Sequence, residues 1–202
     1  MYLSQYLKKE NITVEDDTVR NLEIFADMLI KWNSVHNLTG SDTCVSIYAN
    51  IADSLFVKNV LETPDSLLDV GSGAGFPGMV LAIAWRSTQV VLCEPRAKRA
   101  SFLRNVLAEL NIDNVIVEKK RVENLRGKVF DMISSRAVTD VARMLDMTKH
   151  LRGEKFRYVL FKGGNIDREL KFLKNREFSF DTLRRGKRVY LFLSGTQKFR
   201  IT

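Results

Sequence analysis

The feature that most constrains the fold is a change in the hydrophobic pattern at Ser66. From this residue onward, short apolar runs typical of strands alternate with longer runs in which apolar residues recur at helical spacing. The strand-like runs are 66–70, 89–94, 115–118, 130–134 and 158–162, and helical runs fit between them at 77–85, 97–110, 139–150 and 166–173. Strands joined through helices form βαβ units, so the pattern predicts an α/β fold with a parallel sheet and right-handed crossovers.

The end of the chain follows a different pattern. Two strand-like runs, 178–184 and 188–193, flank a turn at Arg185-Gly186-Lys187. Strands joined by so short a connection pair antiparallel, as a hairpin. A mostly parallel sheet that ends in such a hairpin is typical of the seven-stranded, Rossmann-like class I methyltransferase fold, which we predict for residues 66–202.

Residues 1–65 lack strand-like runs and are predicted to form an N-terminal helical extension. Thr13 precedes three acidic residues and has the character of a helix cap, and apolar residues then recur at helical spacing to about Ser34. Ser41 is the expected cap of a second helix, which ends before Pro64. The expected apolar stripe of this second helix is Val45, Tyr48, Ala52, Leu55 and Phe56.

The composition excludes several classes of protein. With 45% hydrophobic residues in 202, the chain is neither disordered nor collagen-like. Two cysteines without a CxxC pattern, and only two histidines, argue against a metal site and against a disulfide framework. The N-terminus has no signal-peptide pattern, and no run of eighteen apolar residues could span a membrane. We expect a monomer in the cytoplasm.

The charge is divided unevenly along the chain. Residues 1–66 hold five basic and ten acidic side chains, whereas residues 67–202 hold 27 basic and 14 acidic ones. A solvated basic surface would explain any single lysine or arginine. A domain with a balance of +13 beside a segment of −5 instead indicates a polyanionic partner, most simply a nucleic acid.

A glycine-rich loop follows the first predicted parallel strand. Gly73, Gly75 and Gly78 fit the GxGxxG dinucleotide fingerprint, which alone is weak, whereas Gly71, Gly73 and Gly75 fit GxGxG preceded by Asp69. Either pattern puts a ligand at a strand C-terminus beside the start of a helix.

Two carboxylates distinguish the candidate ligands. Asp69 would repel a pyrophosphate but suits a ligand that carries an ammonium and a sulfonium, and Glu94 ends the next strand, where it can accept both ribose hydroxyls. The loop therefore favours S-adenosyl-L-methionine over NAD. A degenerate loop that binds neither ligand is a further alternative.

Several segments together resemble one family, RsmG/GidB, the bacterial 16S ribosomal RNA (guanine-N7) methyltransferases. The most specific are the run Asp69-Val70-Gly71-Ser72-Gly73-Ala74-Gly75-Phe76-Pro77-Gly78 and the segment Ser135-Arg136-Ala137. Others are Trp32-Asn33, Asn37-Leu38-Thr39, Asp53-Ser54-Leu55, Lys98-Arg99, Phe102-Leu103, Arg121-Val122-Glu123 and Phe130-Asp131. The resemblance implies 16S ribosomal RNA of the small ribosomal subunit as substrate and S-adenosyl-L-methionine as methyl donor.

The resemblance also implies particular contact residues. S-adenosyl-L-methionine contacts are expected at Gly71, Phe76, Val122, Glu123 and Arg136. Two departures from the family bear on RNA contacts: Asn50 stands where the family usually has histidine, and 193–198 only loosely match its basic, proline-containing tail.

The chemistry expected at this site needs no general base, because guanine N7 carries a free lone pair. Arg136 is the residue expected to position the reactants. Basic residues at the same rim of the sheet are candidates for holding RNA phosphates, and they are Arg96, Lys98, Arg99, Lys119 and Lys162.

Two other functions are compatible with the glycine loop. A small-molecule methyltransferase would share the glycine loop but would not need a domain with a charge of +13. An RNA-binding protein on a methyltransferase scaffold would be favoured by loss of Asp69, Glu94 or a glycine, and all of these are present.

Overall fold

The computed structural model describes residues 1–40, 43–164, 166–174, 176 and 178–195. Within them, seven strands form one sheet in the order β3-β2-β1-β4-β5-β7-β6. The strands are β1 (Ser66–Val70), β2 (Gln89–Cys93), β3 (Val115–Glu118), β4 (Phe130–Arg136), β5 (Arg152–Lys162), β6 (Ser179–Arg185) and β7 (Arg188–Ser194). Strands β1 to β5 are parallel, and β7 lies antiparallel between β5 and β6. The predicted sheet with its C-terminal hairpin is confirmed.

Helices connect and cover these strands. They are α1 (Leu3–Lys9), α2 (Asp16–His36), α3 (Cys44–Leu55), α4 (Gly78–Ala84), α5 (Ala97–Glu109), α6 (Val141–Met147) and α7 (Asp167–Lys174), with short 3-10 turns η1 (Phe56–Asn59), η2 (Val122–Asn124) and η3 (Lys149–Leu151). Within the described residues, no helix combines the length and the apolar character that a membrane span requires.

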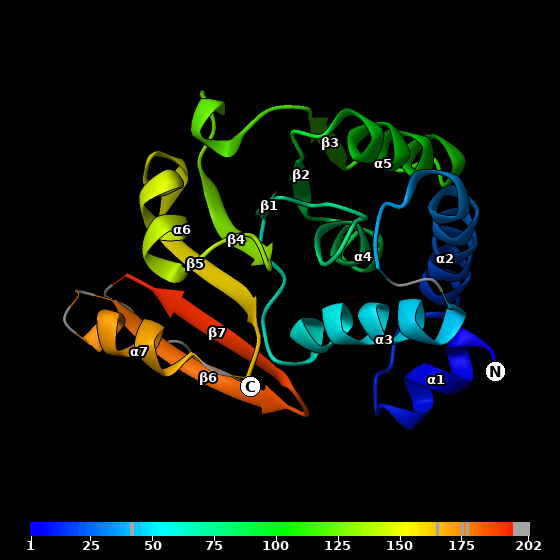
Figure 1. The fold of residues 1–202 in the computed structure, drawn as a ribbon, viewed down its shortest axis with the longest axis horizontal. Helices are drawn as coiled ribbons and strands as arrows, with labels where there is room; N and C mark the ends of the chain where they lie inside the picture. The colour runs from blue at the N-terminus through cyan, green and yellow to red at the C-terminus, as the bar shows by residue number, and fades with distance from the viewer. Residues whose placement is uncertain (41–42, 165, 175, 177, 196–202) are drawn as a thin grey trace.

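The sheet is buried on both faces, which makes a three-layer sandwich. Successive residues of β1, Leu67 and Leu68, point to opposite faces and enter two different hydrophobic clusters. Helices α1 to α5 cover one face and α6 and α7 the other (Figure 1). Because both faces are covered, the central strands consist of apolar runs rather than of alternating polar and apolar residues.

Strand β5 is longer than the sequence predicted. It begins at Arg152 rather than at 158, and its pairing with β4 is irregular between Phe130 and Met132. Residues 153–156 are only partly buried or exposed. The later part of β5 was recognised by its apolar run, and residues 153–156 have no such run, so the start of the strand was not predicted.

The N-terminal extension is helical as predicted, but its boundaries differ. Helix α1 was not predicted, and α2 has Glu15 rather than Thr13 as its N-cap. The N-cap of α3 is Thr43, whose hydroxyl accepts from the backbone N–H of Ser46 at 3.2 Å, while the predicted cap Ser41 lies outside the described residues.

The buried face of α3 also differs from the predicted stripe. Ile47 and Ile51 are fully buried, as are Leu55 and, almost completely, Ala52, whereas Val45 is 54% exposed. The two faces of this short helix are both partly apolar, so the spacing alone did not identify which one packs inward.

The N-terminal helices share a hydrophobic core with the sheet. Phe25 of α2 packs edge-on against Phe76 of the glycine loop, with ring centroids 5.6 Å apart, and also against Phe102 of α5 at 6.1 Å. The predicted division at 65/66 coincides with the start of β1. One cluster of buried residues spans both parts. The division of the chain into an N-terminal extension and a sheet domain stays a prediction.

A buried carboxylate ties the glycine loop to the sheet. Asp69, in β1, is fully buried. Its Oδ1 accepts from Ser134 Oγ in β4 at 2.7 Å, and its Oδ2 accepts from the backbone N–H of Gly78, the first residue of α4, at 3.2 Å. Burial raises the pKa of Asp69 to about 6, although these two hydrogen bonds oppose the shift.

The raised pKa predicts a pH-dependent stability that Asp69→Asn removes. The folded state holds the Asp69 proton more tightly than the unfolded chain, where the ordinary pKa is 3.8. The tighter proton binding adds to the free energy of unfolding. This contribution is complete below about pH 4 and is lost as the pH rises through about 6, and it amounts to on the order of 3 kcal/mol. Urea unfolding of both proteins from about pH 4 to about pH 7 measures the difference. Parallel pH curves would contradict the prediction.

Candidate functional site

The register of the parallel strands creates the site. Val70 of β1 pairs with Cys93 of β2 on one side and with Ser135 of β4 on the other. The next residue along each strand is Gly71, Glu94 or Arg136, and all three emerge at the same carboxyl edge of the sheet. This is the edge at which open α/β sheets bind their ligands.

A pocket of about 470 Å³ opens at this edge. It is lined by segments 38–40, 71–74, 94–96 and 136–138, together with Asn50, Phe76 and Arg99. Segment 38–40 and Asn50 come from the N-terminal extension, so the extension forms part of the pocket wall.

The glycine loop is shaped by left-handed backbone conformations. Gly71 has φ +68°, and a Cβ there would lie 2.5 Å from Val138 Cγ2; Gly73 has φ +57°, and a Cβ there would make ordinary contacts, 3.7 Å from the carbonyl oxygen of Gly71 and 3.9 Å from Arg99 Nη1. Both line the pocket, and their contact with a ligand stays a prediction. Because neither carries a side chain, a ligand can approach the backbone of the loop closely.

Two predicted contact residues lie beneath the loop rather than in the pocket wall. Gly75 is buried, and a Cβ there would lie 2.9 Å from Met79 Cβ and 3.1 Å from Phe25 Cζ. Asp69 is fully buried and does not line the pocket. The prediction that Asp69 faces a cationic ligand is therefore corrected: its carboxylate holds the loop and the start of α4.

Glu94 lies in the pocket wall, as predicted. Its Oε2 accepts from the backbone N–H of Gly73 at 2.9 Å, and its Oε1 accepts from the backbone N–H of Arg96 at 2.8 Å. Each carboxylate oxygen can accept a second hydrogen bond. Glu94 therefore fixes the glycine loop and retains the acceptor capacity that a pair of ribose hydroxyls requires.

Arg136 lies at the end of β4 and lines the pocket. Its guanidinium carbon is 5.7 Å from the centre of the Phe76 ring, and its Nη2 donates to Asn50 Oδ1. Its Nη1 is buried without a hydrogen-bond partner, and Asp53 Oδ2 is 3.6 Å from it. Burial and the nearby Arg188 lower the pKa of Arg136, while Asp53 opposes that shift.

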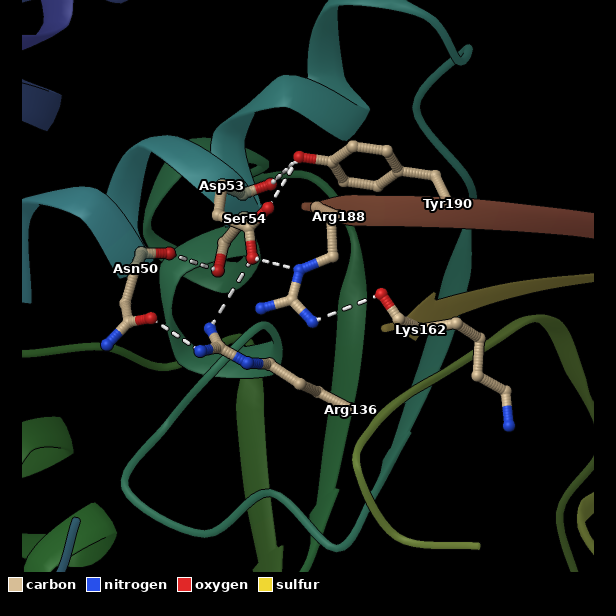
Figure 2. Close-up of polar contacts among 7 residues, drawn as sticks. All are labelled: Asn50, Asp53, Ser54, Arg136, Lys162, Arg188 and Tyr190. Carbon is tan, nitrogen blue, oxygen red and sulfur yellow. Dashed lines mark hydrogen bonds and ion pairs between the residues drawn. The ribbon is translucent and has the colours of Figure 1, made fainter. Parts of the chain in front are cut away.

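The residues that surround Arg136 were not predicted as site residues. Asp53 of α3 accepts hydrogen bonds from Arg188 and Tyr190 of β7, next to Arg136 (Figure 2). Asp53 belongs to one of the segments that carry the family resemblance, which was its only signal. Arg188 and Tyr190 had none, because they lie in a hairpin far along the chain.

Val122 and Glu123 are not part of this pocket wall. Both belong to the turn η2, which follows β3. Val122 is buried in the hydrophobic cluster beneath α6, and neither residue lines the pocket. Their contact with a ligand stays a prediction that rests on the resemblance.

The predicted basic residues fall into two groups. Arg96 and Arg99 line the pocket, and Lys98 and Lys119 are exposed at the same rim. Lys162 differs, because its side chain is only 12% exposed and its Nζ contacts Glu169 Oε2 at 2.7 Å and the carbonyl oxygen of Thr139 at 2.9 Å. The structure thus gives Lys162 a structural role and argues against it as an RNA contact.

Neither a metal-ligand group nor a reactive cysteine is found among the described residues of the site. Among the described residues there is no group of His, Cys, Asp and Glu side chains that could hold a metal ion. Cys93 is buried, and its burial, with neighbouring carboxylates, raises the pKa of its thiol to about 12, so it is no nucleophile.

The comparisons with known proteins agree with this geometry. A solved structure of ribosomal protein L11 methylase from Lactobacillus delbrueckii subsp. bulgaricus has the same fold, with a TM-score of 0.60, 15% identity, and coverage of 74% of this chain and 80% of that one. Two curated relatives carry the name ribosomal RNA small subunit methyltransferase G. The one from Aliarcobacter butzleri is 39% identical and the one from Wolinella succinogenes 34%, each over 96% of this chain and 98% of the relative. The family model described as GidB, rRNA small subunit methyltransferase G, matches residues 18–190. The chain belongs to the GidB family of rRNA small subunit methyltransferases.

Proposed function

We propose that this protein transfers a methyl group from S-adenosyl-L-methionine to N7 of a guanine in 16S ribosomal RNA, with the small ribosomal subunit as its partner. The observation that carries the proposal is the convergence of the glycine loop, Glu94 and Arg136 on one pocket, in a chain of the GidB family. The names of the relatives support ribosomal RNA as the substrate class.

The residues of the pocket fit S-adenosyl-L-methionine. Gly71 and Gly73 line the pocket with backbone atoms alone, and Glu94 has acceptor capacity for the ribose. The buried Nη1 of Arg136 lacks an acceptor, which a ligand carboxylate or a guanine edge would supply. When bound, S-adenosyl-L-methionine supplies a methyl group that is already activated by its positively charged sulfur.

The main requirement of the reaction is that the protein aligns guanine N7 with the methyl group. Guanine N7 needs no deprotonation before it accepts a methyl group, so the absence of an acid–base pair in the described pocket wall is consistent with this chemistry. Arg136 stays protonated and serves as a fixed donor. Its contacts with Phe76 and Asn50 hold its plane at the rim, where nucleophile and methyl group must meet in line.

The basic residues of the rim support an RNA substrate over a small molecule. Arg96 and Arg99 line the pocket, and Lys98 and Lys119 extend the positive surface away from it. Lysine and arginine at such positions neutralise phosphates and fix the register of a nucleic acid. A small-molecule methyltransferase would have no use for this extended surface.

The direct test is to map 7-methylguanosine in 16S ribosomal RNA. Unmethylated 16S RNA and small subunits are incubated with the protein and S-adenosyl-L-methionine, and the modified position is located by cleavage and mass spectrometry. We expect one guanine to be modified at N7. Methylation of no RNA, despite binding of the methyl donor, would overturn the proposal.

Gly73→Asp should abolish binding of S-adenosyl-L-methionine. The new side chain would project from the pocket wall next to the Gly71 carbonyl oxygen and the Arg99 guanidinium, and would take up space in the pocket. Isothermal titration measures the loss. The matched control is Gly186→Asp, because Gly186 has nearly the same φ, +56°, and open space, but lies in the hairpin turn. Equal affinity in a folded Gly73→Asp protein and in its control would refute the assignment.

Arg136→Ala should lower methyl transfer by at least about tenfold, roughly 1.4 kcal/mol of barrier. Arg136→Lys should restore only part of the rate, because lysine keeps the charge but lacks the planar fork. Single-turnover transfer at saturating S-adenosyl-L-methionine, next to a thermal melt, gives the result. A wild-type rate in a normally melting Arg136→Ala protein would remove Arg136 from the site.

A further inference from the structure

We infer that Asp53, Arg188 and Tyr190 form a positioning cluster that fixes the guanidinium of Arg136 at the pocket. The inference rests on the proposed function, since it concerns the residue that we expect to align the reactants. It assigns a task in the reaction to Arg188 and Tyr190, which do not themselves line the pocket.

Asp53 is the centre of the cluster. Its Oδ2 accepts from Arg188 Nε at 2.8 Å and lies 3.6 Å from Arg136 Nη1, and its Oδ1 accepts from Tyr190 Oη at 2.6 Å. Figure 2 shows the two guanidinium groups side by side below this carboxylate. The Asp53 side chain is only 14% exposed, so solvent screens these charges weakly.

The distances show how the carboxylate is shared. Arg188 and Tyr190 occupy one oxygen each at hydrogen-bonding distance, and Arg136 Nη1 is left beyond that distance. Arg136 is therefore attracted to Asp53 and oriented by Asn50, while one of its donors stays without an acceptor in the protein. Such an arrangement orients a guanidinium and leaves a donor for the ligand.

The charges of the cluster also favour a role for Arg136 in binding a ligand at the pocket. Two guanidinium groups share one carboxylate, which leaves an excess positive charge at the pocket side. A buried cation without full pairing is costly, and an anionic or electron-rich acceptor relieves that cost. If Arg188 or Tyr190 were lost, Asp53 Oδ2 or Oδ1 would be released to bind Arg136 directly and draw it away from the pocket.

The cluster also joins distant parts of the chain. Asp53 lies on α3, Arg136 ends β4, and Arg188 and Tyr190 lie on β7. Arg188 Nη1 additionally contacts the carbonyl oxygen of Lys162 in β5 at 3.4 Å. If the cluster only stabilised this junction, a substitution in it would have the same effect whether or not Arg136 is present. If it positions Arg136, the effect of the substitution would depend on Arg136.

The test is a double-mutant cycle of Asp53→Asn with Arg136→Ala. It is measured on two quantities: the single-turnover rate on ribosomal RNA and the dissociation constant of S-adenosyl-L-methionine by titration. We expect Asp53→Asn to change at least one of them about tenfold in the wild-type background and less than about twofold in the Arg136→Ala background. Equal effects in both backgrounds, on both quantities, would overturn the inference.

Two further variants separate positioning from stability. Asp131→Asn is the matched control, because Asp131 accepts from Ser66 Oγ at 2.7 Å at the opposite end of β4, and it should leave both quantities unchanged even if the melt falls. Tyr190→Phe should show the same dependence on Arg136 as Asp53→Asn, with a smaller effect. If Asp53→Asn does not fold, the Tyr190→Phe cycle decides the question. A wild-type protein that methylates no ribosomal RNA would instead overturn the proposed function.

Discussion

The pocket depends first on one buried carboxylate. Asp69 accepts from Ser134 of β4 and from the first backbone N–H of α4, so it joins three elements at the point where the glycine loop leaves the sheet. A Cβ at Gly78 would lie 2.4 Å from this carboxylate, which requires glycine at that position. The loop above can hold its left-handed turns because its two ends are fixed in this way, and the shape of the pocket wall follows from those turns.

Two further carboxylates, Glu94 and Asp53, organise the rest of the pocket. Glu94 holds the loop from β2, while Asp53 brings Arg136 together with the hairpin. The N-terminal helices take part directly, because Asp53 and Asn50 lie on α3 and Phe25 of α2 packs against Phe76. The acidic extension is thus a structural part of the site, and the basic surface that suits RNA lies on the sheet domain.

Much of this site could be predicted from sequence because its signals are local. The glycine loop and Glu94 each follow a strand and Arg136 ends one, and parallel strands bring their carboxyl ends together at one edge. The position of Asp69 near the end of β1 was predicted correctly, but its predicted contact with a cationic ligand was not, because its carboxylate is buried. A single sequence does not reveal whether a carboxylate near the end of a strand faces the pocket or the core. Lys162 was misjudged for the same reason, since its partner Glu169 lies in the next helix and only the fold brings the two together.

The class of fold, the position of the glycine loop and the family could all be predicted from the amino-acid sequence. These depend on periodicity and on short motifs, whose physical causes act over a few residues. Two features could be recognised only in the folded chain. One is the meeting of Asp53, Arg136, Arg188 and Tyr190, and the other is the packing of Gly75 against Phe25 instead of in the pocket wall. Asp53 and Tyr190 are 137 positions apart in the chain. Contacts over such separations are set by the packing of whole elements, and a single sequence holds no local pattern for them.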